Sequence, residues 1–226
     1  MSTIRELIYN TRNILYNGLG SDDYILSDKQ IKHWYNVERN FLLKEKIDKE
    51  KQSIPNAEQS LGCVFLECVD KAQCANLGIY SDEYISRTDI IPSLLNTDTF
   101  GEMIAEITTV YGDAIEFTTK PIANKAKFKK YTKHQRRAFI DNGRIYILNA
   151  DNLEIIKIKG IFENPEEVSN FVDCDGVTCY TDDSEYPLPA NMIGILNELI
   201  FKKYISYMLN SRQDRTNNSN NDNKEN

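Results

Sequence analysis

Residues 187–213 read PLPANMIGILNELIFKKYISYMLNSRQ, and this stretch decides the fold that we expect. Pro189 suits the first turn of a helix, which we expect to run to about Asn210. Apolar side chains cover well over half of the circumference of this helix. An apolar surface that wide predicts a helix enclosed by several neighbours. The natural neighbours are two helices predicted at the other end of the chain.

Two capping boxes mark those N-terminal helices. Thr3 and Glu6 open a helix over residues 4–16, and Ser27 and Gln30 open a longer second helix. A capping box satisfies two backbone N–H groups that a helix start leaves without partners. The pattern therefore predicts two helices within the first 55 residues.

The second helix mixes aromatic and charged residues. Trp34 and Tyr35 lie on its apolar side, so we expect them to pack against the last helix. Residues 44–51 are almost all charged, and we expect this part to run outward toward a neighbouring chain.

Between about residues 59 and 186 the pattern changes to short strands. Turn residues at Gly112-Asp113 and at Asn142-Gly143 predict two hairpins. Many short strands separated by Gly, Asn and Asp turns indicate a small antiparallel sandwich or a barrel-like sheet.

These segments predict an α+β fold, in which a helical layer built from both ends of the chain carries an inserted antiparallel β domain. We expect the N-terminal helices over 1–55, the β domain over 56–187, the C-terminal helix over 188–212 and a polar extended tail over 213–226. The tail is rich in Asn and has no apolar residues with which to form a core.

The charge and hydropathy of the 226 residues narrow the function. A net charge of −7 argues against general nucleic-acid binding, although a local basic patch is compatible with it. No run approaches the roughly 18 apolar residues of a membrane span, so no membrane partner is expected. Arg5 and Glu6 interrupt the start of the chain, so we also expect no export signal.

The chain has five cysteines, and an odd number in a chain without an export signal predicts reduced, buried thiols. The spacing C-x4-C occurs twice and raises the question of zinc. Cys63 and Cys68 fall on a predicted strand, where residues five apart point to opposite faces. Structural zinc sites also use tighter spacings. We therefore expect no metal site at either pair, Cys63/Cys68 or Cys174/Cys179, or at Cys74.

A search for catalytic groups finds no constellation. His33 and His134 are the only histidines, and neither lies near a nucleophile motif. No phosphate-binding glycine loop is present. Asp173 and Asp175 resemble the start of a calcium loop, but the Glu that should close such a loop is missing. The sequence predicts a protein that is not an enzyme and that has no cofactor.

The strongest electrostatic feature is the basic segment, residues 125–137, which reads KAKFKKYTKHQRR. Aromatic Phe128 and Tyr131 are interleaved with its charges. Three interpretations stay open: a solvated connection between strands, a phosphate-facing surface, or a dock for an acidic partner or a neighbouring subunit. Its seven basic residues are Lys125, Lys127, Lys129, Lys130, Lys133, Arg136 and Arg137.

A DNA-binding regulatory protein that uses the basic segment is the alternative function. A helix-turn-helix at the N-terminus is disfavoured, because that motif needs a turn of about three or four residues. The linker between Gly18 and Ser27 is longer than that. The distal half of the second helix also alternates in charge sign instead of being uniformly basic.

The order of several short motifs resembles a known family. Ser21-Asp22-Asp23 precedes a capped helix with Ile31, Trp34/Tyr35 and Arg39; RTDIIP at 87–92 and GRIYILN at 143–149 follow in the β region. A PLP element at 187–189 then opens the apolar helix, and a polar tail closes the chain. This arrangement is similar to the tail-ring, or head-to-tail connector, proteins of crAss-like bacteriophages.

The resemblance implies a structural virion protein of the phage neck or tail, assembled in the cytoplasm of the bacterial host. Such subunits form a ring, typically dodecameric, below the portal and around the channel through which the genome passes. The implied partners are copies of the same chain, the portal and adjacent tail proteins, with genomic DNA close by in the channel. The expected interface residues are Trp34, Tyr35, Arg39, Lys44, Tyr204, Arg212 and Asp214.

Overall fold

The computed structural model describes residues 2–16, 26–69, 85–126 and 128–208. These residues form helices and a mostly antiparallel sheet, which confirms the predicted α+β class. They divide into two compact units. The helical unit takes its described residues from 1–50 and 182–226, and the β unit takes them from 51–181.

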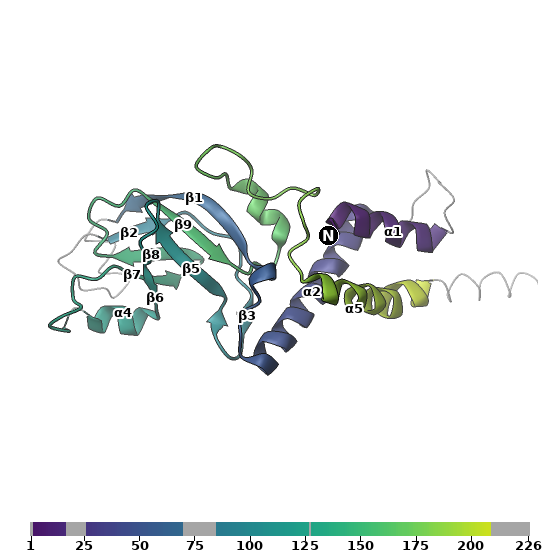
Figure 1. Cartoon of the computed structure of the whole chain (residues 1–226), viewed down its shortest axis with the longest axis horizontal. Helices are drawn as coiled ribbons and strands as arrows, with labels where there is room; N and C mark the ends of the chain where they lie inside the picture. The colour runs from purple at the N-terminus through teal and green to yellow at the C-terminus, as the bar shows by residue number, and fades with distance from the viewer. Residues whose placement is uncertain (1, 17–25, 70–84, 127, 209–226) are drawn as a thin grey trace, which may run out of the picture. The chain divides into compact units, whose positions relative to one another are not determined.

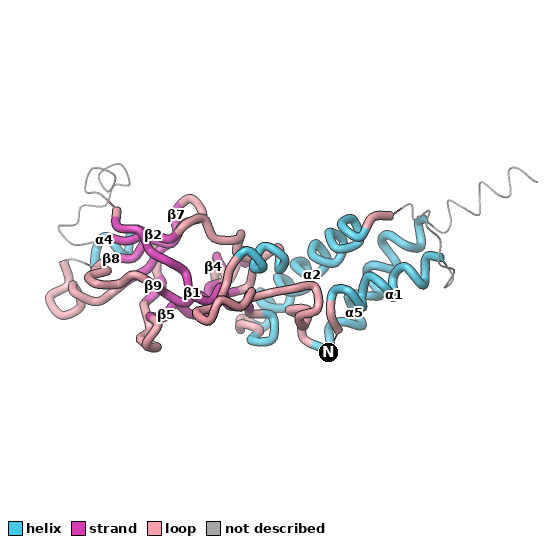
Figure 2. Tube along the Cα trace, turned by 90° about the horizontal axis from the view of Figure 1, so that it is seen from above, coloured by secondary structure: helices cyan, strands magenta, loops and turns pink. Residues whose placement is uncertain are grey.

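The helical unit consists of α1 (Ile4–Tyr16), α2 (Asp28–Glu50) and α5 (Ala190–Ile200), and α2 contacts both other helices (Figures 1 and 2). The helix α5 continues as a π-helical turn, η3 (Phe201–Ile205), and then as α-helix to residue 208.

The predicted capping boxes are confirmed at the starts of α1 and α2. The Thr3 N–H donates to Glu6 Oε2 (3.1 Å), and the Glu6 N–H donates to Thr3 Oγ1 (3.2 Å). At the start of α2 the Gln30 N–H donates to Ser27 Oγ (3.3 Å). These bonds fix where each helix begins.

The last helix corrects one expectation. We expected α5 to be enclosed by several neighbours, but its buried residues are Met192, Leu196 and Ile200, with Ile205 in η3. Met192, Leu196 and Ile200 are spaced four apart, and Ile205 follows after five residues in the π-helical turn, so all four lie on a single stripe. Other apolar residues of the same helix remain exposed. The prediction was wrong because apolar content alone does not say how many neighbours the chain supplies.

The β unit is built on one seven-stranded sheet in the order β5-β9-β1-β2-β8-β7-β6 (Figure 1). All pairs are antiparallel except β6 with β7. The strands are β1 (Gln59–Cys68), β2 (Ile85–Thr88), β5 (Ile104–Thr109), β6 (Glu116–Phe117), β7 (Arg137–Asp141), β8 (Arg144–Leu148) and β9 (Ile155–Gly160). Smaller elements are the hairpin of β3 (Asn96–Thr97) and β4 (Gly101–Glu102), the 3₁₀ helices η1 (Pro55–Ala57) and η2 (Pro165–Asn170), and the α-helix α4 (Lys120–Ala126).

Of the two expected arrangements, a sandwich and a barrel-like sheet, the single seven-stranded sheet is closer to the barrel. The first and last strands of the order, β5 and β6, are joined by a tight turn, and the Ile115 N–H donates to Ile107 O (2.8 Å). One main core fills the space between the strands and the segments that cover them. It is formed by Leu61, Val64, Ile91, Leu94, Ile107, Ile115, Ala138, Ile145, Ile147, Ala150, Ile156, Ile158, Phe162, Val168 and Tyr180.

The two predicted hairpins are present. Asn142 and Gly143 adopt φ of 51° and 71°, as a two-residue hairpin turn requires, and join β7 to β8. The turn at Gly112 joins β5 to the segment before β6. On the other side of β7 and β8, Phe139 and Tyr146 stack with ring centroids 5.4 Å apart, in a small core that includes Ala123 of α4. This core positions the start of the basic segment.

Candidate functional site

An aromatic contact joins α2 to the last helix. The Trp34 ring stacks on Tyr204 with centroids 4.6 Å apart and an angle of 9° between the ring planes. The Tyr35 hydroxyl donates to Asn197 Oδ1 (3.0 Å) and shares a hydrogen bond with the hydroxyl of Thr11 on α1 (2.9 Å). The prediction that Trp34 and Tyr35 pack against the last helix is confirmed.

Burial shapes the chemistry of Tyr35. Its side chain lies among all three helices and is almost completely buried. Burial raises the pKa of the Tyr35 hydroxyl, because an apolar environment disfavours the phenolate, and the hydrogen bond with Thr11 offsets part of this effect. This hydroxyl is therefore a neutral hydrogen-bonding group that ties α1 and α5 to α2.

A buried carboxylate lies one helical turn further along α2. Glu38 has a side chain that is 3% exposed; it accepts from Lys203 Nζ (2.7 Å) and from the Tyr204 hydroxyl (3.0 Å). Burial, and then the bond to Glu38, raise the pKa of Tyr204. Sequence reasoning missed Glu38, although its position four residues after Trp34 places it on the buried side of α2.

Arg39 is completely buried and fastens the segment that leads into α5. Its Nε donates to the carbonyl of Pro187 (2.8 Å), and its guanidinium carbon lies 6.0 Å from the centroid of the Tyr186 ring. A buried guanidinium needs such partners, since an unpaired buried charge is costly. The Tyr186 hydroxyl in turn donates to Asn36 Oδ1 (3.1 Å).

The expected interface residues therefore have different surroundings. The side chains of Trp34, Tyr35 and Arg39 are buried within the helical unit, and their contacts described above are internal. Lys44 and Tyr204 are half-buried. Arg212 and Asp214 lie outside the described residues. Side chains that the helical unit leaves exposed are better placed to meet a neighbouring subunit.

The basic segment is fastened to the β unit at its end. The Arg137 side chain is 5% exposed; its Nε donates to Glu116 Oε2 (2.8 Å) and its Nη1 to Thr132 O (3.0 Å). Asn149 Nδ2 donates to the carbonyls of Lys133 (2.8 Å) and Gln135 (2.9 Å). Arg137 thus has a structural role in holding this connection against the sheet.

The middle of the basic segment is exposed. Phe128 and Tyr131 are 79% and 87% exposed, and Lys130 Nζ lies 5.5 Å from the centroid of the Tyr131 ring. Four exposed lysines make no ion pair with any residue of the described ranges, namely Lys125, Lys129, Lys130 and Lys133. Lys127 lies outside the described residues, and Arg136 is half-buried and donates to Asp151 O (3.3 Å). The segment presents cationic and aromatic groups together.

The cysteines correct a second expectation. Cys63 and Cys174 form a disulfide, with Cα atoms 5.1 Å apart, instead of remaining reduced. The segment after η2 brings them together, because Val172 O accepts the Cys63 N–H (3.2 Å). Cys68 and Cys179 are free thiols, and burial raises the pKa of Cys179, with a further contribution from Asp173. Cys74 lies outside the described residues.

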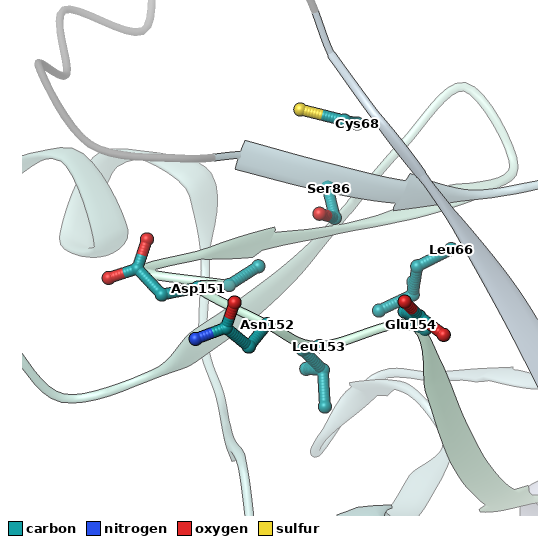
Figure 3. A pocket seen from close by; sticks show the side chains of 8 residues that line it. Leu66, Cys68, Ser86, Asp151, Asn152, Leu153 and Glu154 are labelled. Atoms are coloured by element: carbon teal, nitrogen blue, oxygen red, sulfur yellow. The ribbon is translucent and has the colours of Figure 1, made fainter.

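A pocket opens beside the paired ends of β1 and β2, with a volume of about 600 Å³. Cys68 and Ser86 lie opposite one another on the two strands, and Asp151 and Glu154 come from the loop before β9 (Figure 3). These groups do not form a recognisable catalytic set, because neither histidine of the chain lines the pocket.

Among the described residues, no three His, Cys, Asp or Glu side chains are grouped so that they could hold a metal ion. His33 and His134 are both exposed. Within the same residues, each helix is too short or too polar to cross a bilayer.

Comparison with known proteins gives one result that covers almost the whole chain. The family model for phage tail ring protein 2, of crAss-like phages, matches residues 6–223. No curated protein matches the chain. The match spans both the helical unit and the β unit, so it concerns the arrangement as a whole and not one motif.

Proposed function

The chain belongs to the family of phage tail ring protein 2, whose members are structural proteins of the phage tail. From this membership we propose that copies of the chain form a closed ring below the portal, around the genome channel. The ring is expected to be dodecameric. The observation that carries the proposal is the family match over residues 6–223. The resulting function is structural, with the subunit located in the virion.

The helical unit is suited to form the layer in which subunits pack. The buried charged side chains Glu38 and Arg39 already have partners inside this unit. Exposed apolar side chains occur on each of its helices, including Tyr9 on α1, Phe41 on α2 and Ile195 on α5. A ring contact is heterologous, so one subunit must present two different surfaces. We assign subunit packing to this unit and contact with the adjacent ring to the β unit.

The acidic balance of the chain agrees with a position beside DNA. A net charge of −7 lets a polyanion slide past without strong attachment, if the acidic residues line the channel. The basic segment concentrates charge of the opposite sign at one place. We assign it to contact with an acidic protein partner, such as the portal or an adjacent tail protein.

Native mass spectrometry and negative-stain electron microscopy of the purified chain, alone and with the portal, test this function. We expect closed rings of one size, alone or on addition of the portal. A chain that stays strictly monomeric and binds neither the portal nor other tail proteins overturns the proposal.

The exposed lysines of the basic segment favour one second candidate, binding of duplex DNA. Four lysines with two exposed aromatic side chains suit a phosphate surface. Affinity for duplex DNA measured against salt concentration discriminates: each phosphate contact contributes a slope of about −0.9 in log K against log salt. A slope near zero excludes this candidate.

A further inference from the structure

The Cys63–Cys174 disulfide joins two segments of the β unit that are far apart in the sequence. Cys63 lies on β1, and Cys174 lies in the strap, which we define as residues 171–179, the segment after η2. The two cysteines are separated by 111 residues, and their Cα atoms are 5.1 Å apart. That distance is typical of cysteines that are joined by a disulfide. The question is what brings them together.

The strap keeps its shape through hydrogen bonds of its own. The Asp173 N–H donates to Val177 O (2.8 Å). At the base of the same turn, the Cys179 N–H donates to Phe171 O (3.0 Å). Asp173 Oδ1 also accepts from the N–H groups of Asp175 (2.9 Å) and Val177 (2.8 Å). None of these bonds involves a sulfur atom, so the turn of the strap should form with or without the disulfide.

The ends of the strap are anchored in the β unit, whereas its middle is exposed. Phe171 and Cys179 are half-buried and pack against the main core. Residues 174–178 are exposed. The strap is held to β1 by the bond from the Cys63 N–H to Val172 O (3.2 Å) and by the disulfide. Reducing the disulfide should therefore loosen the middle of the strap while the core stays in place.

The redox surroundings of a virion protein change during its life. The chain is made in a bacterial cytoplasm, where thiols are kept reduced, and the finished particle then passes into an oxidising exterior. The expectation of reduced thiols from the sequence and the disulfide in the structure then describe the same two cysteines before and after this passage.

We propose that Cys63 and Cys174 form a redox-sensitive lock. Both are thiols while the chain folds and assembles, and they are oxidised to the disulfide once the particle has left the cytoplasm, which fastens the strap onto β1. The inference rests on the proposed function, because it is as a virion subunit that the chain makes this passage.

The oxidation is a thiol–disulfide exchange with a small-molecule disulfide of the exterior. The exposed Cys174 loses its proton to water, and its thiolate attacks one sulfur of the small disulfide, so that a mixed disulfide forms and one small thiolate leaves. The Cys63 thiolate then attacks Cys174 Sγ and releases the second small thiolate. The two cysteine thiols lose two electrons and two protons, and the small disulfide gains them to become two thiols.

The two free thiols of the described residues are less suited to this exchange. Cys179 is half-buried; burial raises the pKa of its thiol, and the Asp173 carboxylate raises it further, so little of the reactive thiolate is present. Cys68 is exposed, but it lies five residues from Cys63 on the same strand, where the two side chains point to opposite faces. Cys68 therefore provides a matched control.

The first experiment follows the redox state of the full-length chain. The chain is produced in a bacterial cytoplasm, and its thiols are trapped with N-ethylmaleimide in denaturant at lysis, before peptide mass spectrometry. We expect Cys63 and Cys174 to be alkylated. When the native chain is incubated with oxidised glutathione before trapping, we expect one link, between Cys63 and Cys174. A pair already linked at lysis, or a link through another cysteine in its place, overturns the lock.

The second experiment measures what the lock holds, by hydrogen exchange of the oxidised and the reduced chain. We expect the amides of the strap to exchange at least about tenfold faster in the reduced chain, while peptides from β7 and β8 are unchanged. Cys174→Ser should behave like the reduced chain in both conditions, and Cys68→Ser should keep the difference. Equal exchange of the strap in both states overturns the proposal. Faster exchange throughout the reduced β unit also overturns it, because the disulfide is then needed for folding.

Ring formation, measured by native mass spectrometry of the reduced and the oxidised chain, separates this inference from the proposed function. We expect the reduced chain to form rings. If rings form from the oxidised chain alone, the proposed order of assembly and oxidation is wrong while the ring stands. A chain that closes the lock but forms no ring in either state supports the lock and overturns the ring.

Discussion

Glu38 illustrates how one residue stabilises the helical unit. Its carboxylate is buried and accepts from Lys203 and Tyr204, so it links α2 to the last helix through charge and through a neutral hydroxyl. Removing an acceptor from a buried group leaves its donors without partners. Because Lys203 can still reach water, part of this loss is recovered.

We predict that Glu38→Ala lowers the free energy of unfolding by about 2 kcal/mol, measured by urea denaturation. Glu198→Ala is the matched control. Glu198 also pairs with a lysine of the last helix, Lys202, but it is exposed, so its loss should leave the free energy of unfolding nearly unchanged. Equal effects of the two substitutions would contradict the role given to burial.

Tyr35 makes the free energy of unfolding of the helical unit depend on pH in the alkaline range. Burial raises its pKa, so above the unfolded value of about 10 the folded chain retains a proton that the unfolded chain loses. By linkage, this contribution is complete below about pH 10 and is lost as the pH rises through the folded pKa. Stability should therefore fall across that range.

The measurement is the free energy of unfolding between about pH 9 and pH 11, compared with Tyr35→Phe. The variant should be less stable at neutral pH, because Asn197 and Thr11 lose a partner, and its loss of stability with pH should be shallower. An equally steep loss in both proteins would show that Tyr35 does not carry the effect. Tyr204, whose pKa is also raised, remains in both proteins and contributes to the slope that is left.

Residue-level prediction from the sequence succeeded where a local rule applied. Helical periodicity placed Trp34 and Tyr35 against the last helix, and capping chemistry placed Thr3 and Glu6. Glu38 and Arg39 were different, because charged residues are buried only when partners distant in the sequence are brought to them. Lys203 lies 165 residues from Glu38, and the Pro187 carbonyl lies 148 residues from Arg39. No local pattern encodes such pairs.

At the scale of elements, strand β1 depends on a close approach by a following segment. A Cβ at Gly62 would lie 2.5 Å from Val172 O and 2.6 Å from the Asp173 Cα, and Gly62 has a φ of +68°. The neighbouring residue Cys63 is joined to Cys174 by the disulfide. Gly62 therefore allows the segment after η2 to lie against β1.

We predict that Gly62→Ala destabilises the chain by about 3 kcal/mol or more in thermal or urea unfolding, because positive φ and a backbone clash act together. Gly176→Ala is the control. It has a φ of +80° but nothing described within 4 Å of an added Cβ, so it should cost only about 1–2 kcal/mol. If the Gly62→Ala protein is as stable as the Gly176→Ala protein, the segment after η2 can move away from β1 without a loss of stability, and the prediction is wrong.

The elements differ in how far the sequence predicted them. Hairpins and capped helices were predicted because turn and cap residues lie beside the structures they cause. The sequence did not predict the surroundings of α5 or the Cys63–Cys174 disulfide, because both depend on which distant segments of the chain meet. For α5 the error is informative. An apolar helix that the described residues cover on one stripe is expected where another segment or chain completes the burial.

At the scale of the whole molecule, apolar and charged surfaces are separated along the chain. The exposed apolar side chains Tyr9, Phe41 and Ile195 belong to the helical unit, whereas the exposed lysines of the basic segment belong to the β unit. Between Glu116 and Asp141 the chain has eight basic residues and no acidic one. The two kinds of surface respond to salt in opposite ways, because salt screens exposed charges but does not weaken apolar burial.

We therefore predict that ring formation persists when salt is raised from about 0.1 M to about 1 M, over which the Debye length falls from about 10 Å to about 3 Å. Binding of an acidic protein partner through the basic segment should be lost over the same range.

The measurement is sedimentation of the assembled chain at both salt concentrations. It is repeated with a variant in which Gln replaces four lysines, namely Lys125, Lys129, Lys130 and Lys133. Because these lysines are exposed and make no ion pair with any described residue, the variant should fold and form rings like the wild type. Rings that dissociate at high salt, or that require the four lysines, would place the contact between copies on the basic segment instead of on the helical unit.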